Sequence, residues 1–282
     1  MSTVAPSQAP APAAGRPARP AYKVTSVRVL RSEWAKMWSL RSTWITLGLG
    51  LLFLIAFGLI AAYQFKSRIT SGRHMDRDFA DATALSLSLF GTNFAQLALG
   101  VLGVLVAAGE YSTGMIRSTL AAVPRRLPVL WSKAAVFGAV ALLLGTAGVF
   151  ATFLADSGIV SGTRAAMTLS DAGVVRSLLG AGLYLGLVGV IGVALGALLR
   201  SVAGGISVLV ASLMLVPGLV SLLPSSWQDD ISPYLPSHAG EAMFTLHHDT
   251  TTLSPTAGLM VFGLWTVAAL AAAAVRLVRS DA

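Results

Sequence analysis

The chain has 282 residues, of which 55% are hydrophobic and only 11% charged, and its net charge is +8. Soluble domains carry roughly a quarter charged residues, so this composition excludes an ordinary soluble globular protein and favours a polytopic membrane protein. The lack of cysteine excludes disulfides and thiolate metal sites. The excess of Lys and Arg does not require nucleic acid as a partner, because basic residues at helix ends face anionic membrane lipids.

The N-terminal region divides into two parts. Residues 1–22 contain five of the twelve prolines among Ala, Ser and Gly, which predicts a disordered cytoplasmic tail. Residues 23–42 contain a predicted basic amphipathic helix, Ser26–Arg41, suited to the membrane interface before the first span. The alternative is a soluble helix packed on the cytoplasmic side. The apolar residues of this helix recur at helical spacing: Val27, Leu30, Trp34, Met37 and Trp38.

Residues 43–279 form the predicted membrane domain. A helix needs about 20 mostly apolar residues to cross the hydrocarbon core, where lipid cannot satisfy free backbone groups. Six segments meet this requirement and contain no Asp, Glu, Lys, Arg or His: Trp44–Tyr63, Ala84–Ala108, Ala134–Ala155, Ser177–Leu199, Val202–Leu223 and Ala257–Val275. We therefore expect an all-α polytopic membrane protein with six transmembrane helices.

The basic residues predict the orientation of these spans. If both termini are cytoplasmic, the inside holds 14 basic residues (Lys and Arg) and 3 acidic ones (Asp and Glu). The outside then holds 6 basic and 9 acidic residues. Positive residues concentrate on the cytoplasmic side of membrane proteins, so this arrangement in the plasma (inner) membrane is favoured. The first outside loop opposes the trend, because it carries Lys66, Arg68, Arg73 and Arg77.

Local signals predict irregularities among the later segments. Small residues lie on one face of the third span, and glycines repeat every four residues in the fourth, which predicts close helix packing. Packing within one subunit is favoured, and a subunit interface or a pathway lining stays open. Only Arg200-Ser201 separates the fourth and fifth spans, which forces a tight cytoplasmic turn. Pro217 should kink or break the fifth span because it removes a backbone donor. The longest outside loop, residues 224–255, has no assigned role, and Ser237–Leu246 within it is a candidate for a short helix dipping toward the membrane.

The chain lacks the motifs of an energy-coupling or hydrolytic enzyme. It has no Gly-x-x-x-x-Gly-Lys-Ser/Thr loop for ATP, no His-Glu-x-x-His and no Gly-x-Ser-x-Gly. Because the spans hold no ionisable residue to relay protons, any work requires energy from another subunit. We expect no catalytic residue and no metal site. The polar residues of the last outside loop match no strong metal motif: His238, Glu241, His247, His248 and Asp249.

Two amide side chains stand out in the second span. Asn93 and Gln96 lie one helical turn apart. Amides at this depth either line a solute pathway or hydrogen-bond a neighbouring helix. Both interpretations stay open from the residues alone.

The segment between the second and third spans, Gly109–Arg126, is polar and basic. Glu110 follows the span directly and is expected to reach cytoplasmic water. Ser112 or Thr113 is expected to cap a short helix that ends before Pro124. Apolar residues recur within it at helical spacing: Ile116, Leu120 and Val123. The residues alone leave two interpretations, an amphipathic helix on the cytoplasmic face or an ordinary positively charged loop.

Three motifs and the six-span layout resemble the type-2 (ABC-2-like) family of ABC transporter permeases, over about Thr25 to Arg279. The first lies before the first span, the second follows the second span, and the third joins the fourth and fifth spans. They are Arg31-Ser-Glu33-Trp-Ala-Lys36 with Arg41-Ser42, Gly109-Glu110-Tyr111-Ser112-Thr113-Gly114 with Ile116-Arg117 and Pro124-Arg125-Arg126, and Leu198-Leu-Arg200-Ser201. Many family members carry a longer basic side chain where this chain has Ser112.

The resemblance implies a permease subunit, not itself an enzyme, that pairs with a second permease copy or paralogue. Two ATP-binding subunits would dock underneath and hold ATP and Mg, so this chain would bind no cofactor. Family members mostly export lipids, glycans, peptides or drugs. The loop after the second span would be a coupling helix, and the turn between the fourth and fifth spans a smaller contact. The implied coupling residues are Glu110, Tyr111, Thr113, Gly114, Arg117 and Arg200.

Two other classes of function compete with this one. A membrane-embedded enzyme acting on lipid or peptide would need nucleophiles, carboxylates or metal ligands at membrane depth, and the spans offer only hydroxyls and two amides. A membrane anchor or sensor would recruit soluble partners without transport. Activity of the purified chain without ATP would favour the enzyme, and stimulation of a co-purifying ATPase would argue against the anchor.

Overall fold

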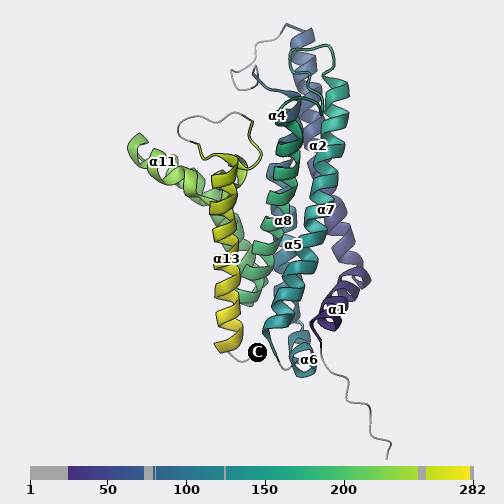
Figure 1. Cartoon of the computed structure of the whole chain (residues 1–282), viewed down its shortest axis with the longest axis vertical. Helices are drawn as coiled ribbons and strands as arrows, with labels where there is room; N and C mark the ends of the chain where they lie inside the picture. The colour runs from purple at the N-terminus through teal and green to yellow at the C-terminus, as the bar shows by residue number, and fades with distance from the viewer. Residues whose placement is uncertain (1–24, 73–78, 80, 124, 247–251, 280–282) are drawn as a thin grey trace, which may run out of the picture.

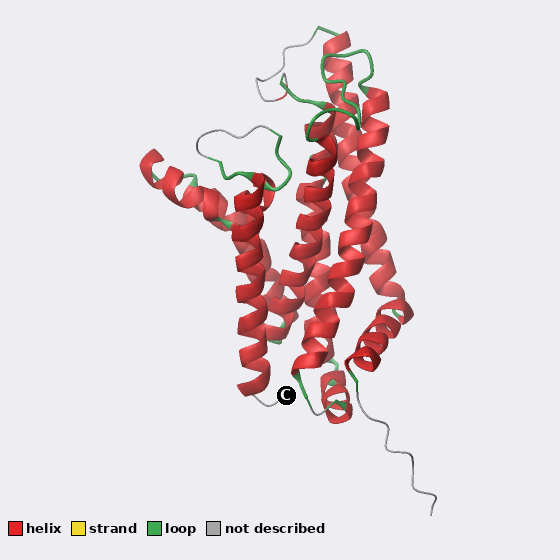
Figure 2. Cartoon of the chain, in the orientation of Figure 1, coloured by secondary structure: helices red, strands yellow, loops and turns green. Residues whose placement is uncertain are grey.

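The computed structural model describes residues 25–72, 79, 81–123, 125–246 and 252–279 (Figure 1). Within these residues all regular elements are helical (Figure 2), and six helical segments are long and apolar enough to cross a membrane. The all-α, six-span membrane fold is therefore confirmed. The predicted tail, residues 1–22, lies outside the described residues.

The first four spans form a bundle of long helices. Their elements are α1 (Ser26–Ser39), α2 (Arg41–Thr70), α4 (Ala84–Leu89), α5 (Thr92–Ser112), α6 (Met115–Ala122), α7 (Leu127–Ile159) and α8 (Val174–Leu199). Helices α1 and α6 lie at one end of the bundle, here called the α6 end (Figure 1).

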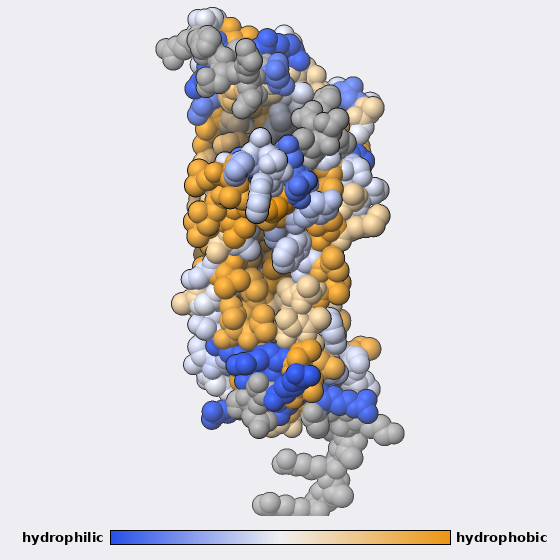
Figure 3. Space-filling model, turned by 90° about the vertical axis from the view of Figure 1, so that its left-hand side faces the viewer, coloured by the Kyte–Doolittle hydropathy of each residue, from blue (hydrophilic) through white to orange (hydrophobic). Residues whose placement is uncertain are grey.

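The rest of the chain packs along one side of the bundle (Figure 1). Its elements are α9 (Val202–Val210), the π-helical turn η1 (Ala211–Leu215), α10 (Val216–Val220), α11 (Ser225–Ile231), the 3₁₀ turn η2 (Ser232–Tyr234), α12 (Pro236–Ala242) and α13 (Pro255–Arg279). Helix α11 projects sideways from the bundle, short of the end opposite α6 (Figure 1). We call that opposite end the α12 end. In Figure 3 apolar side chains cover most of the middle of the visible face, and hydrophilic ones gather toward both ends.

Helix α8 is the centre of the bundle, and glycines bring its backbone against its neighbours. A Cβ on Gly192 would lie 2.2 Å from the carbonyl oxygen of Gly100 in α5. A Cβ on Gly103 would lie 2.4 Å from the carbonyl oxygen of Gly189. In lipid, where apolar side chains gain little by leaving the solvent, such close approach supplies the packing attraction between helices. The predicted close packing within one chain is confirmed.

Two spans depart from regular α-helix. The second, predicted as one helix over Ala84–Ala108, breaks between α4 and α5, where Gly91 packs against the backbone of Leu54 so tightly that a Cβ would lie 2.0 Å from its carbonyl oxygen. The fifth span changes to the π-helical turn η1 directly before Pro217. Proline has no N–H to donate, and helix irregularities gather at such positions. The chain nevertheless stays helical from Val202 to Val220, so Pro217 is accompanied by a π-helical turn and not by the predicted break.

The helices extend beyond the predicted apolar windows and take in ionisable residues. Helix α7 includes Lys133 and Asp156, and α5 includes Glu110. All three side chains are buried, with Asp156 fully enclosed. The expectation that Glu110 reaches water is therefore wrong, because its carboxylate faces the bundle rather than the end of the helix.

The segment between α10 and α13 reaches back along the bundle. The predicted helix Ser237–Leu246 is shorter and begins one residue earlier, as α12. The indole N–H of Trp265 in α13 donates to the Tyr234 carbonyl at 3.0 Å. Trp265 lies ten residues into α13, which corresponds to a depth of about 15 Å along that helix. The turn before α12 therefore lies beside the middle of α13, whereas a dip of Ser237–Leu246 into the membrane stays a prediction.

We predict that Gly192→Ala weakens the bundle, because the added methyl group would overlap the Gly100 carbonyl. Overpacking of this kind costs about 1–3 kcal/mol of unfolding free energy, so the Tm of the detergent-purified protein should fall. The matched control is Gly263→Ala, since a Cβ on Gly263 meets nothing within 4 Å. Equal Tm values for the two variants would contradict the proposed backbone contact.

Candidate functional site

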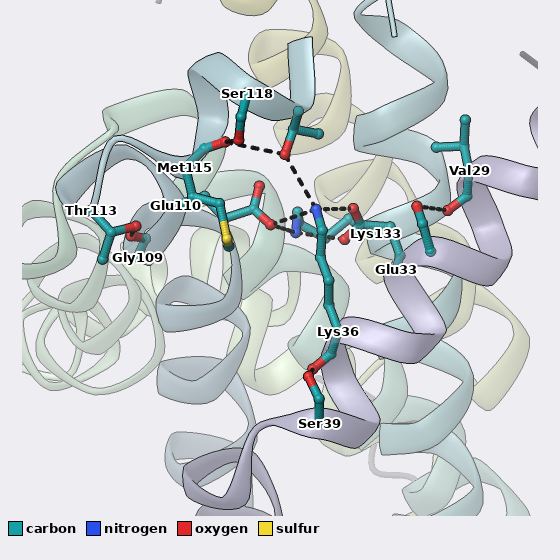
Figure 4. Close-up of polar contacts among 12 residues, drawn as sticks. Val29, Glu33, Lys36, Ser39, Gly109, Glu110, Thr113, Met115, Ser118 and Lys133 are labelled. Carbon is teal, nitrogen blue, oxygen red and sulfur yellow. Dashed lines mark hydrogen bonds and ion pairs between the residues drawn. The ribbon is translucent and has the colours of Figure 1, made fainter. Parts of the chain in front are cut away.

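A network of four charged side chains, three of them buried and one half-buried, joins three helices at the α6 end (Figure 4). Glu33 and Lys36 come from α1, Glu110 from α5 and Lys133 from α7. The Lys133 ammonium donates to Glu33 at 2.6 Å and to Glu110 at 2.8 Å. The Lys36 ammonium donates to Glu33 at 2.7 Å and to Glu110 at 3.0 Å. Each cation therefore bridges both carboxylates, and the four formal charges cancel.

Helix α1 contributes to this network through a face that its apolar pattern does not reveal. Val29, Glu33 and Met37, spaced by four residues, are its buried side chains. The predicted apolar side chains Trp34 and Trp38 are 46% and 61% exposed. An amphipathic helix is present, but its tryptophans point away from the bundle, where lipid can cover them, and its carboxylate points inward.

The network is stable only as a whole. Removing one member of a buried ion pair costs about 3–5 kcal/mol, because the remaining charge stays in a medium of low polarity. Burial lowers the pKa of Lys36, but its hydrogen bonds and proximity to Glu33 and Glu110 outweigh this effect and raise the pKa above its usual value. Lys36 is therefore charged at neutral pH. Its contribution to stability is lost only as the pH rises through the raised pKa of the folded protein.

The network also contacts α6. The Lys36 ammonium reaches the hydroxyl oxygen of Thr119 at 3.4 Å. Helix α6 is amphipathic, with Ile116 buried and Met115, Arg117 and Ser118 exposed. The interpretation of this segment as an amphipathic helix is therefore correct, and one turn of it is connected to α1 by a side-chain hydrogen bond.

The predicted cap of α6 is wrong. The hydroxyls of Ser112 and Thr113 donate backward to the Gly109 carbonyl, at 3.0 and 2.8 Å. These short side chains compete for carbonyls of the preceding turn, so they close α5 instead of starting α6. Gly114, with φ of 72°, occupies the left-handed region at the junction, a conformation that glycine adopts without strain.

The turn between α8 and α9 contacts the end of α5. The Arg200 guanidinium lies over the Tyr111 ring, 5.2 Å from its centroid. Arg200 itself has φ of 54°, and the Ser201 hydroxyl caps α9 by accepting from the Gly204 N–H at 3.2 Å. The tight turn is confirmed, and two residues predicted from separate motifs, Tyr111 and Arg200, lie in contact.

The predicted coupling residues thus occupy three different environments. Glu110 is inside the charge network, Tyr111 and Arg200 pair beside it, and Thr113, Gly114 and Arg117 lie at or on α6. Sequence reasoning assigned no site role to four members of the arrangement: Glu33, Lys36, Thr119 and Lys133. The sequence does contain one sign of this network. Glu33 lies four residues from both Val29 and Met37, so helical spacing places its carboxylate on the same face of α1 as these two apolar side chains.

The two amides of the second span border a cavity of about 520 Å³ near the α12 end. Gln96 is buried and accepts a hydrogen bond from the Tyr184 hydroxyl of α8, whereas Asn93 is exposed and donates to the Phe90 carbonyl. For Gln96 the hydrogen bond to a neighbouring helix is confirmed, and the side chain also lines this cavity, whereas lining of a solute pathway stays a prediction.

Neither protein-family models nor curated proteins match this chain. Over the residues that the structure describes, no group of three or more His, Cys, Asp and Glu is arranged to hold a metal ion. His247, His248 and Asp249, in the connection before α13, lie outside those residues.

We predict that Lys133→Gln destabilises the protein by about 3–5 kcal/mol, because Glu110 and Glu33 would share only one cation. The double variant Glu110→Gln, Lys133→Gln should recover part of this loss, because it leaves the neutral Glu33–Lys36 pair, which is joined at 2.7 Å. A double-mutant cycle on unfolding free energies measures this coupling. Arg31→Gln, on the exposed side of α1, serves as the control. Strict additivity of the two single changes would contradict the network.

Proposed function

We propose that this chain is the permease subunit of an ATP-driven ABC transporter, an exporter in the plasma membrane. It works with a separate ATP-binding subunit and a second permease copy or paralogue. The observation that carries the proposal is the charge network, because it connects a short surface helix, α6, to α1 and to the ends of two spans, α5 and α7. In such an arrangement, a displacement of α6 by a bound subunit would displace the ends of the bundle helices as well.

Movement of α6 has several routes into the bundle. The chain leads directly from α6 into α5 and α7, and Thr119 contacts Lys36 of α1. Because Glu110 binds Lys36 and Lys133 binds Glu33, the three helices move together or break a costly network. Switching a cavity from 1:99 to 99:1 between two states requires about 5.5 kcal/mol. Closure of an ATP-binding dimer is the supplier in this proposal.

The structure changes the role proposed for Glu110. A carboxylate with 4% exposure inside a network cannot form the docking surface of a soluble subunit. The side chains available to such a subunit are those exposed on α6: Met115, Arg117, Ser118, Ala121 and Ala122. Glu110 instead acts as an internal link between α5, α1 and α7.

The proposed orientation can be tested because the chain has no cysteine, so every introduced thiol is unique. Ser118→Cys on α6 should resist a membrane-impermeant maleimide in intact cells and react after permeabilisation. Ser161→Cys, on the exposed connection after α7, should react in intact cells. Labelling of Ser118→Cys in intact cells would reverse the orientation and with it the proposed docking side.

The proposed coupling predicts that Arg117→Cys forms a crosslink to a nucleotide-hydrolysing subunit in native membranes, and that Ser161→Cys does not. Arg117→Glu should reduce stimulation of the ATPase and transport together, with unchanged Tm, because the side chain is exposed.

Thr119→Val tests the link between α6 and α1. With this variant, docking of the ATPase should persist while transport falls. Full transport by both variants would refute α6 as the input of force.

A further inference from the structure

The cavity near the α12 end has the size and composition of a small-molecule site. It lies among α4, α5, α8, η1 and α12, and its volume of about 520 Å³ falls in the range of pockets that hold organic ligands. Its wall includes apolar side chains from separate elements: Leu85, Leu89, Phe90, Leu213 and Phe244.

Polar atoms in the wall lack partners. Thr92 is 2% exposed, and its hydroxyl oxygen has no hydrogen-bond partner among the described residues. The buried hydroxyl oxygen of Ser237, contributed by α12, is in the same condition. Nearly all buried polar groups in proteins are hydrogen-bonded. A hydroxyl can both donate and accept, so two such groups from residues that line one cavity indicate an occupant with hydrogen-bonding atoms.

The charges of the wall favour a cation. Asp81 and Glu241 contribute two carboxylates, and the described lining residues include no Lys or Arg. Arg176 lies behind the wall, where its guanidinium donates to the Thr245 carbonyl at 2.9 Å. A ligand with an ammonium group and an apolar body would match the carboxylates, the hydroxyls and the apolar side chains at once.

We propose that this cavity binds an amphiphilic organic cation, and that such a cation is what the permease moves. The second half of the statement rests on the proposed function. The first half concerns binding alone and requires neither ATP nor a partner subunit. Thr92 and Ser237 would accept hydrogen bonds from the ammonium group, and Glu241 and Asp81 would balance its charge.

The test uses the purified full chain in lipid nanodiscs and two probes of the same shape and opposite charge, tetraphenylphosphonium and tetraphenylborate. Protein-free discs give the background. Saturable binding of the phosphonium without saturable binding of the borate is expected. Glu241→Gln should weaken phosphonium binding roughly fivefold, as loss of a partly exposed charge near the site would do. Asp229→Asn, an exposed carboxylate of α11 outside the cavity, should leave it unchanged.

A second pair tests the hydroxyls by displacement of bound phosphonium. Dodecylammonium carries N–H donors, and dodecyltrimethylammonium has the same charge without them. Thr92→Val should weaken only the first. Equal saturable binding of phosphonium and borate, or no effect of Glu241→Gln, would overturn the cation site even if α6 couples to an ATPase. Selective cation binding without ATPase stimulation would keep the site and refute the transporter.

Discussion

The balance of two cations against two carboxylates inside the α6 end is the constraint on which the rest of the structure depends. None of Glu33, Glu110 and Lys133 can leave the bundle or lose its partner without stranding a charge in a medium of low polarity. The network therefore fixes α1 against α5 and α7, and through Lys36 it reaches α6. A surface helix that would otherwise be a simple connection becomes part of a cooperative unit.

A second constraint, the direct contact of glycine backbones between α5 and α8, keeps the middle of the bundle rigid. The bundle departs from regular α-helix at two other places, the α4–α5 junction and η1. Both places border the cavity lined by Gln96 and Tyr184. The polar wall of the cavity and the charged α6 end thus lie at opposite ends of the same helix, α5, which connects the proposed input of force to the proposed binding site.

Several features follow from the sequence because they depend on neighbours along the chain. Apolar length predicts the spans, the two-residue connection at Arg200 predicts the tight turn, and Pro217 predicts an irregularity in the fifth span. The short helix after the second span was open to two interpretations, since amphipathic spacing over eight residues occurs in both helices and loops. The prediction that Ser112 or Thr113 caps α6 was wrong. Their hydroxyls are equally able to cap the following helix or to bond a carbonyl of the preceding one, and here they bond the preceding one.

By itself, the sequence determined that the protein is an all-helical, six-span membrane protein without an ATP motif of its own, because length, hydropathy and motif spacing are local properties. The tertiary structure alone decided which ionisable residues are buried and with which partners. Lys36 and Glu110 are 74 positions apart, and Glu33 and Lys133 are 100 positions apart. No periodicity links residues at such distances, and only the packing of α1, α5 and α7 turns four ordinary helix-end charges into one network.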